Sequence, residues 1–189
     1  MELLTALAAL PSGTHRGPLV RSRVLRVVDL LTTADLRDRV VDAGAQVSEA
    51  HLRSIELGRR TLSDELHPAL AAAYRLHPDD LIRVNPDPHS PIGGPLVPIR
   101  VLRRPSMRFP QGLHLEDLPG VIAEASRRLG KEIGVDASTL TNVELGRARA
   151  SDTLRTALAM AYGVHPVWDV TQAPAPRRGR PKRATADAA

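Results

Sequence analysis

The spacing of apolar residues marks two stretches of the chain that repeat one helical pattern. In both stretches, leucine, alanine and tyrosine recur at i, i+3, i+4, i+7 and i+8, which is one face of a helix. The first stretch contains Leu66, Ala69, Leu70, Ala73 and Tyr74, and the second contains Leu154, Ala157, Leu158, Ala161 and Tyr162. Each follows a serine, Ser63 or Ser151, that suits a helix N-cap. We therefore expect the same helix twice.

Shorter amphipathic stretches precede the second of these helices. Residues 136–146 predict a helix capped by Asp136, with Leu140 and Val143 facing inward and Gly146 just beyond its end. Its outer face carries small polar side chains rather than the Lys and Glu that are usual on a solvated helix. The segment "IAEASRRLGKEIGV" (122–135) predicts an earlier helix with Leu129 and Ile133 facing inward that ends at Gly134.

The corresponding part of the first copy has a more degenerate pattern. Residues 33–47 predict a helix with Leu36 and Val40 facing inward and a break at Gly44. The segments "GPLVRSRVLR" (17–26) and "GPLVPIRVLR" (94–103) are compatible with a strand or an arm as well as with a helix. Neither copy therefore shows a clear helix at its beginning.

Alignment of the two copies shows a tandem duplication. Residues 47–78 lie over residues 135–166 without a gap at an offset of 88, and half of the positions are identical, including "ELGR". The "GPLV" segments match at an offset of 77, so the second copy carries 11 extra residues, which we place in "RPSMRFPQG". The predicted division is an N-terminal helix or arm (1–16), copy 1 (17–83), a Pro/Gly linker (84–93), copy 2 (94–170) and a basic tail (171–189).

The order of short helix, turn, short helix and capped helix resembles a known family. "IGVDASTLTNVELGRARASDTLRTALAMAYGVHP" is similar to the Cro/repressor-type (XRE) helix-turn-helix domain of bacterial and phage regulators. Copy 1 has the same pattern in weaker form. The resemblance implies an all-α fold with two small lambda-repressor-like domains, to which short arms or strands at "GPLVxxRVLR" are added. Pro119 interrupts the region where copy 2 would have a first helix.

The resemblance also implies double-stranded DNA as the partner, with the third helix of each module in the major groove. Matching positions in copy 2 are Ala137, Ser138, Thr139, Thr141, Asn142, Arg147 and Arg149. Those in copy 1 are Ala50, His51, Arg53, Ser54, Arg59 and Arg60, with Glu49 beside them. An asparagine amide suits adenine and an arginine suits guanine. Solvated polar faces remain the alternative interpretation, chiefly for copy 1.

Charge adds to this picture. Copy 1 has ten basic and ten acidic residues, whereas copy 2 has ten basic and eight acidic ones. We therefore expect copy 2 to bind DNA more tightly than copy 1. The tail is Pro- and Ala-rich and predicted to be disordered, with five basic residues against one acid. Its segment Arg178, Gly179, Arg180, Pro181, Lys182 and Arg183 resembles an AT-hook that lies in an A·T-rich minor groove. An unspecific basic tail is the alternative.

Several classes of function are disfavoured. The chain has no cysteine, which excludes disulfides and thiol catalysis. His77 and His165 have no metal-ligating neighbours at the right spacing and are interpreted as turn residues. Glu56, Gly58, Glu144 and Gly146 are interpreted as structural. We find no catalytic motif and expect no enzyme activity, cofactor or metal. No signal peptide or apolar span is evident, so a soluble, cytoplasmic, nucleoid-associated protein is expected.

Three functions fit these observations. The leading one is a sequence-specific transcriptional regulator, most simply a repressor, that reads two half-sites with two modules in one chain. A nucleoid-type architectural protein that prefers AT-rich DNA is the second. The third is an antitoxin or adaptor with an autoregulatory helix-turn-helix, in which the N-terminal "MELLTALAAL" binds a protein partner or a second copy of the chain.

Overall fold

The computed structural model describes residues 17–83, 94–165 and 170–172, and it is mainly helical with a small sheet. The predicted N-terminal helix or arm and the linker lie outside these residues. The elements of copy 1 are β1 (Pro18–Arg21), α2 (Arg23–Val28), α3 (Thr33–Asp42), α4 (Glu49–Glu56), α5 (Leu66–Ala73) and the 3₁₀ helix η1 (Pro78–Asp80). Those that follow are β2 (Leu96–Pro98), the 3₁₀ helix η2 (Ile99–Arg103), α6 (Leu118–Arg128), α7 (Ala137–Glu144), α8 (Asp152–Tyr162) and β3 (Val170–Gln172).

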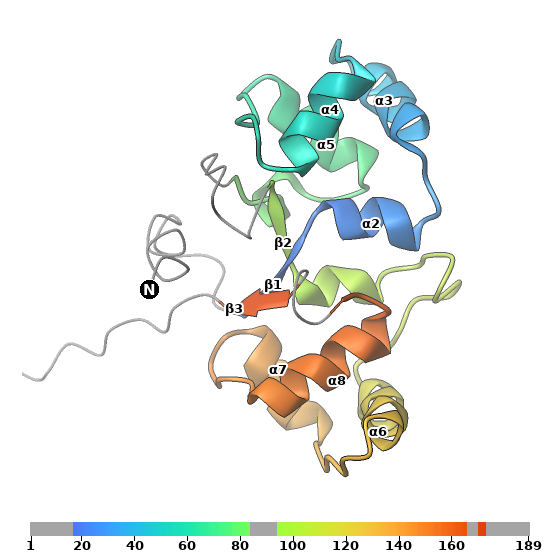
Figure 1. The fold of residues 1–189 in the computed structure, drawn as a ribbon, viewed down its shortest axis with the longest axis vertical. Coiled ribbons are helices and arrows are strands. Elements are labelled where there is room, and N and C mark those ends of the chain that lie inside the picture. The colour runs from blue at the N-terminus through green and yellow to red at the C-terminus, as the bar shows by residue number, and fades with distance from the viewer. Residues whose placement is uncertain (1–16, 84–93, 166–169, 173–189) are drawn as a thin grey trace, which may run out of the picture.

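The two copies meet in an antiparallel ribbon, with the helices of one copy on each side of it (Figure 1). The first strands of the copies, β1 and β2, pair directly, and Val20 lies opposite Val97. These two valines are equivalent positions of the repeat, because they are separated by the offset of 77 that relates the two "GPLV" segments. A residue opposite its own counterpart marks a local two-fold axis, so the sheet joins the copies as a dimer interface would.

The first strand of each copy packs against the other copy. Gly17 of copy 1 lies against the backbone at Glu144 in copy 2, and a Cβ built on Gly17 would be 2.0 Å from the Glu144 carbonyl oxygen. The reciprocal contact joins Gly94 to Glu56, where the same construction gives 2.3 Å. Only a residue without a side chain fits so close to a helix end. The two glycines therefore fix a reciprocal exchange of strands.

The sheet edges show the same exchange. The backbone of Ile82, at the end of copy 1, pairs with Leu96 of β2, and its amide donates to the Leu96 carbonyl at 2.7 Å. At the other edge, β3 pairs with β1. This places Thr171 and Gln172 in the sheet, whereas the sequence assigned them to the disordered tail. The free edge of β1 supplies backbone partners that the composition of the tail does not reveal.

The helices of copy 1 begin close to the predicted positions. Thr32 and Asp35 form a capping box at α3, and Ser48 caps α4 through the amide of His51. The predicted inward residues Leu36 and Val40 are fully buried, and Gly44 follows the helix with a φ of +93°. Regular helix in α5 starts only at Leu66, although the Ser63 hydroxyl accepts a hydrogen bond from the Leu66 amide.

Copy 2 departs from the prediction in its first helices. Pro119 lies in the first turn of α6, where a missing amide proton costs nothing, so it helps to start this helix instead of interrupting it. The helix ends at Arg128, before Gly130 with a φ of +65°, and not at Gly134 as predicted. The "GPLVxxRVLR" segments also have a mixed character. Their first half forms a strand and their second half forms α2 or η2.

The extra residues of copy 2 hold the end of α8. Arg108 donates hydrogen bonds to the carbonyl oxygens of Met160 and Ala161, and its guanidinium group lies 5.5 Å from the centre of the Phe109 ring. Gly163 ends this helix with a φ of +72°. A cation at a helix C-terminus opposes the negative end of the helix dipole. The insertion therefore stabilises a helix end for which copy 1 has no such clamp among its described residues.

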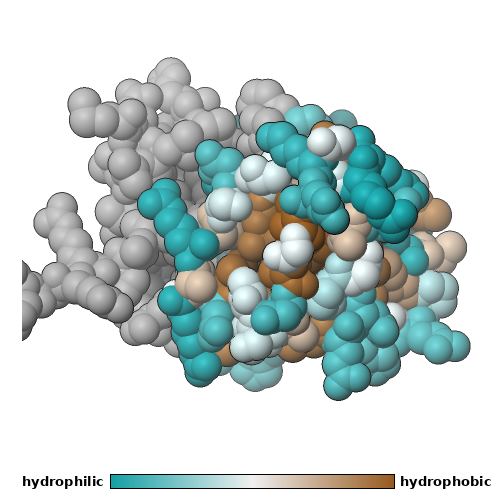
Figure 2. Space-filling view, turned by 90° about the horizontal axis from the view of Figure 1, so that it is seen from below, coloured by the Kyte–Doolittle hydropathy of each residue, from teal (hydrophilic) through white to brown (hydrophobic). Residues whose placement is uncertain are grey.

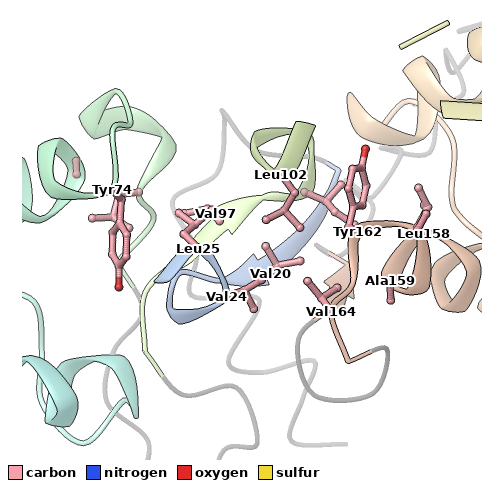
Figure 3. Close-up of a cluster of buried hydrophobic side chains, with 14 of the residues drawn as sticks. Val20, Val24, Leu25, Tyr74, Val97, Leu102, Leu158, Ala159, Tyr162 and Val164 are labelled. Atoms are coloured by element: carbon pink, nitrogen blue, oxygen red, sulfur yellow. The ribbon is translucent and has the colours of Figure 1, made fainter. Parts of the chain in front are cut away.

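Both copies share one hydrophobic core. Val20, Val24, Leu25, Val97 and Leu102 lie between the two tyrosines, Tyr74 in copy 1 and Tyr162 in copy 2 (Figure 3). The predicted inward faces of α5 and α8 are buried in full. The two segments of the repeat are thus interlocked in space, because the first strand of each contacts the other. Among the described residues, no helix is both long and apolar enough to cross a bilayer.

The close approach of Gly17 yields a direct test of strand exchange. We expect Gly17→Ala to lower the free energy of unfolding by about 2 kcal/mol or more, because the new methyl group collides with the backbone of α7. Gly120→Ala is the matched control: it lies in α6 with open space around it and should stabilise by about 0.5–1 kcal/mol. Urea unfolding of both variants measures the difference, and equal effects would contradict the exchange.

Candidate nucleic-acid interface

In each copy, two consecutive helices joined by a turn pack against a third. In copy 1, α3 lies against α4 and α5, and in copy 2, α6 lies against α7 and α8. Apolar residues on the inner faces of α4 and α7 hold both helices to the core: Leu52, Ile55, Leu140 and Val143 are all at most 1 % exposed. The opposite faces of α4 and α7 carry the residues that the sequence predicts to contact DNA.

The N-terminus of α7 is fixed by Asp136, as predicted. Its carboxylate accepts a hydrogen bond of 2.6 Å from the Thr139 amide. This bond holds the pKa of Asp136 below its usual value. An ionised cap at the positive end of the helix dipole favours the helix at neutral pH.

The outer face of α7 consists of small polar side chains. Ser138 and Thr139 are exposed, while Ala137, Thr141 and Asn142 are half-buried. The Thr141 hydroxyl donates to the Ala137 carbonyl at 2.8 Å, which leaves its lone pairs for another donor. Within the described residues, no group hydrogen-bonds the Asn142 amide side chain. The face is thus supplied with donors and acceptors that a ligand can engage.

The outer face of α4 has a different chemistry. Arg53 and Ala50 are exposed, and the half-buried Ser54 donates its hydroxyl proton to the Ala50 carbonyl at 2.8 Å. Glu49 lies 3.3 Å from Arg37 of α3, so its charge is partly compensated. His51 lies within 3.3 Å of the Arg60 guanidinium group. Copy 1 therefore offers one long cationic side chain where copy 2 offers hydroxyl and amide groups.

Arginines beyond the ends of α4 and α7 flank both faces. These are the exposed side chains of Arg59, Arg60, Arg147 and Arg149. The described residues include no ion-pair partner for Arg59, Arg147 or Arg149, and none for Arg53. A guanidinium group with no internal partner is available to an anion such as phosphate. The sequence-predicted residues of each copy are therefore brought together on one helix and the turn after it.

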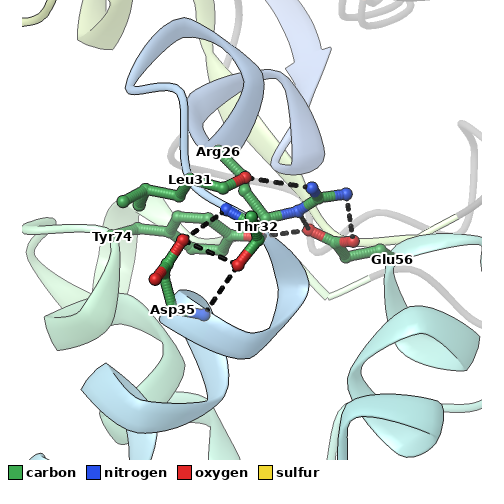
Figure 4. A network of polar contacts seen from close by, with 6 residues as sticks. All are labelled: Arg26, Leu31, Thr32, Asp35, Glu56 and Tyr74. Atoms are coloured by element: carbon green, nitrogen blue, oxygen red, sulfur yellow. Dashed lines mark hydrogen bonds and ion pairs between the residues drawn. The ribbon is translucent and has the colours of Figure 1, made fainter.

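A buried polar network fixes the C-terminal end of α4 (Figure 4). The Glu56 carboxylate, only 4 % exposed, accepts two hydrogen bonds from Arg26 of α2, at 2.9 and 3.0 Å. It also accepts one from the Tyr74 hydroxyl at 2.9 Å. The bond to Glu56 raises the pKa of Arg26, and burial beside that carboxylate raises the pKa of Tyr74.

Copy 2 repeats this network with fewer bonds. Glu144 accepts from Arg103 at 2.9 Å and from the Tyr162 hydroxyl at 3.2 Å. Burial and the nearby Glu144 carboxylate raise the pKa of Tyr162. The prediction that both glutamates are structural is confirmed. Each ties its helix, α4 or α7, to the segment that emerges from the central ribbon.

Sequence reasoning missed this positioning network. Its members are repeated: Glu56 matches Glu144, and Tyr74 matches Tyr162, both at the offset of 88. Arg26 matches Arg103 at the offset of 77. The glutamate, the arginine and the tyrosine are all retained in both copies although the copies have diverged. This shared retention is the sequence signal that could have revealed the network. Gly17 and Gly94 carried a comparable signal, because both begin the repeated "GPLV".

The surface at the end of copy 2 is mixed. Figure 2 shows this end from below, with apolar side chains gathered near the centre of the described surface and polar ones around them. The AT-hook-like residues 178–183 lie outside the described residues.

No group of three or more metal-ligating side chains occurs in the part of the chain that the structure describes. His77 caps η1, and its Nδ1 accepts a hydrogen bond from the Asp79 amide at 3.3 Å, as expected of a turn residue. No protein-family model matches the chain, and no curated protein or solved structure is significantly similar to it.

The raised pKa of both tyrosines predicts loss of stability in alkali. Above pH 10 or so the unfolded chain releases phenol protons that the folded chain retains, so the free energy of unfolding falls by up to about 1.4 kcal/mol per pH unit per tyrosine. The double variant Tyr74→Phe/Tyr162→Phe has no phenol protons to release at these two positions, so they no longer contribute to the pH dependence of unfolding. We expect it to be less stable at pH 7 but to lose less stability from pH 9 to 11, as measured by urea unfolding. Parallel curves would contradict the assignment.

Proposed function

We propose that this chain is a sequence-specific double-stranded DNA-binding protein, a bacterial or phage transcriptional regulator of the repressor kind. In this proposal α3–α4 and α6–α7 are two helix-turn-helix units of lambda-repressor-like modules, and α4 and α7 enter the major groove. The observation that carries it is the outer face of α7. Its hydroxyl and amide groups are exposed or half-exposed, and the arginines that flank them have no ion-pair partner among the described residues.

The geometry of the modules supports the proposal. A major groove about 12 Å wide admits a single helix, and α4 and α7 are both eight-residue helices with one apolar and one polar face. Their N-termini are capped and their C-termini are tied to the core by Glu56 and Glu144. Because both ends of the reading helix are held in place, little further conformational entropy is lost when the helix binds DNA.

The charges support an unequal contribution of the copies. Copy 2 has an excess of two basic residues and copy 1 has none, so phosphate contacts favour copy 2. Glu49 beside the reading face of α4 adds repulsion from phosphate, even when Arg37 compensates part of it. We therefore assign tighter base reading to α7 and weaker reading to α4.

Replacement of Asn142 tests base reading. We expect Asn142→Ala to weaken binding to a preferred site by about 5- to 150-fold, equal to about 1–3 kcal/mol, and to leave binding to unrelated DNA nearly unchanged. Gln111→Ala is the matched control, because it removes an exposed amide from the segment between η2 and α6. Fluorescence anisotropy with labelled duplexes measures both affinities.

Two outcomes would contradict this assignment. If Asn142→Ala left specific affinity intact while Arg53→Ala abolished it, the ranking of the copies would be reversed. If neither variant changed the preference among sequences and genome-wide pulldown gave broad AT-rich coverage, an architectural role would replace the regulatory one.

The basic tail supplies a second test. Removal of residues 173–189 deletes five basic side chains and leaves β3 in place. We expect weaker binding and a shallower dependence of log K on log salt concentration, by up to about 4.5 units, since each phosphate that the tail neutralises adds roughly 0.9 to the slope. Titrations between 50 and 300 mM salt, on the order of physiological ionic strength, measure the slope. An unchanged slope would exclude the tail from the interface.

A further inference from the structure

We propose that the DNA target is an inverted repeat of two unlike half-sites, on which the chain binds in one direction only. This inference rests on the proposed function. It adds the symmetry of the site, the chemistry of each half and the polarity of the complex.

The symmetry follows from the central ribbon. In the pairing of β1 with β2, Val20 lies opposite Val97. On one side of this pair Leu19 lies opposite Pro98, and on the other side Arg21 lies opposite Leu96. With the offset of 77, Leu19 corresponds to Leu96 and Arg21 corresponds to Pro98. The pair Leu19–Pro98 is therefore equivalent to the pair Arg21–Leu96, with the two copies exchanged about the central pair Val20–Val97. This is the register of a two-fold axis and not of a translation.

The same symmetry extends to the reading helices. The contact of Gly17 with the backbone of Glu144 is at the last residue of α7, and the contact of Gly94 with Glu56 is at the last residue of α4. The arginine that follows each strand bonds the glutamate of its own copy, Arg26 to Glu56 and Arg103 to Glu144, whereas the glycine before the strand lies against the glutamate of the other copy. The ribbon thus holds the ends of α4 and α7 through equivalent, reciprocal contacts.

A two-fold relation between reading helices determines how half-sites are oriented. Two identical modules related in this way read the same sequence on opposite strands, so their half-sites form an inverted repeat. Modules joined only by a flexible linker would accept direct, inverted or variably spaced half-sites. The shared sheet and core therefore predict one orientation and one spacing.

The half-sites are unlike because the two reading faces have diverged. Arg53 of α4 corresponds to Thr141 of α7, and Ser54 corresponds to Asn142, by the offset of 88. An arginine fork fits the O6 and N7 acceptors of guanine, whereas an asparagine amide fits the N6 and N7 of adenine. The α4 half-site should thus contain a guanine contact and the α7 half-site an adenine contact.

Unlike half-sites give the complex a direction. A homodimer on a palindrome has two equivalent orientations, but this chain has one in which Arg53 and Asn142 each meet the preferred base. The strand β3, which precedes the basic segment in the sequence, pairs with β1 in the central ribbon. Each operator would therefore define which module faces which side of the regulated region.

Selection of the full chain against a random pool of double-stranded DNA, at physiological salt, tests this inference. We expect enrichment of an inverted repeat of fixed spacing, with centres about one helical turn apart, and with different bases in its two halves. Repeating the selection with Arg53→Ala should relax one half-site only, and Asn142→Ala should relax the other. Gln111→Ala should leave both halves unchanged.

Six outcomes decide against the inference. A direct repeat, a single half-site or variable spacing would overturn the two-fold arrangement of the readers. A perfect palindrome, or loss of the same bases in both variants, would overturn the division of reading between α4 and α7. A pool without any enriched sequence would instead overturn the proposed function, and this inference with it.

Discussion

The pairing of Val20 with Val97 is the constraint on which the rest of the structure depends. Strands of three and four residues are too short to be stable alone, and a two-stranded ribbon needs packing on its faces. Here the helices of both copies supply that packing, and β3 and Ile82 cover the edges. The two modules therefore stabilise each other through a sheet that neither could form by itself.

Buried ion pairs connect the ends of α4 and α7 to the segments that follow β1 and β2. Glu56 and Glu144 would be costly to bury without partners, and each receives an arginine and a tyrosine. Copy 1 uses two guanidinium bonds and copy 2 uses one, while copy 2 has an additional clamp in Arg108. The duplication has thus kept the position of α4 and α7 while the side chains on their outer faces diverged.

Local rules predicted the helices well and the sheet poorly. Caps such as Asp136 and Ser151, and the inward faces of α5 and α8, depend on residues within a few turns of one another, so the sequence contains them. Strand exchange depends on Gly17 meeting Glu144, which no local pattern encodes. The predicted contact residues of each copy lie on one helix and the turn after it, but the pairing of Glu49 with Arg37 and the bonds from Arg26 to Glu56 required the tertiary structure.

Because their first strands are exchanged, we expect the two copies to unfold as one cooperative unit. Native-state hydrogen exchange of the full chain tests it most directly, through the slowest amides of α5 and α8, which lie in opposite copies. We expect equal opening free energies for both helices, equal to the free energy of global unfolding, and equal losses in both when Gly94→Ala is introduced. Opening of one copy at a clearly lower free energy, with the other copy still protected, would contradict it.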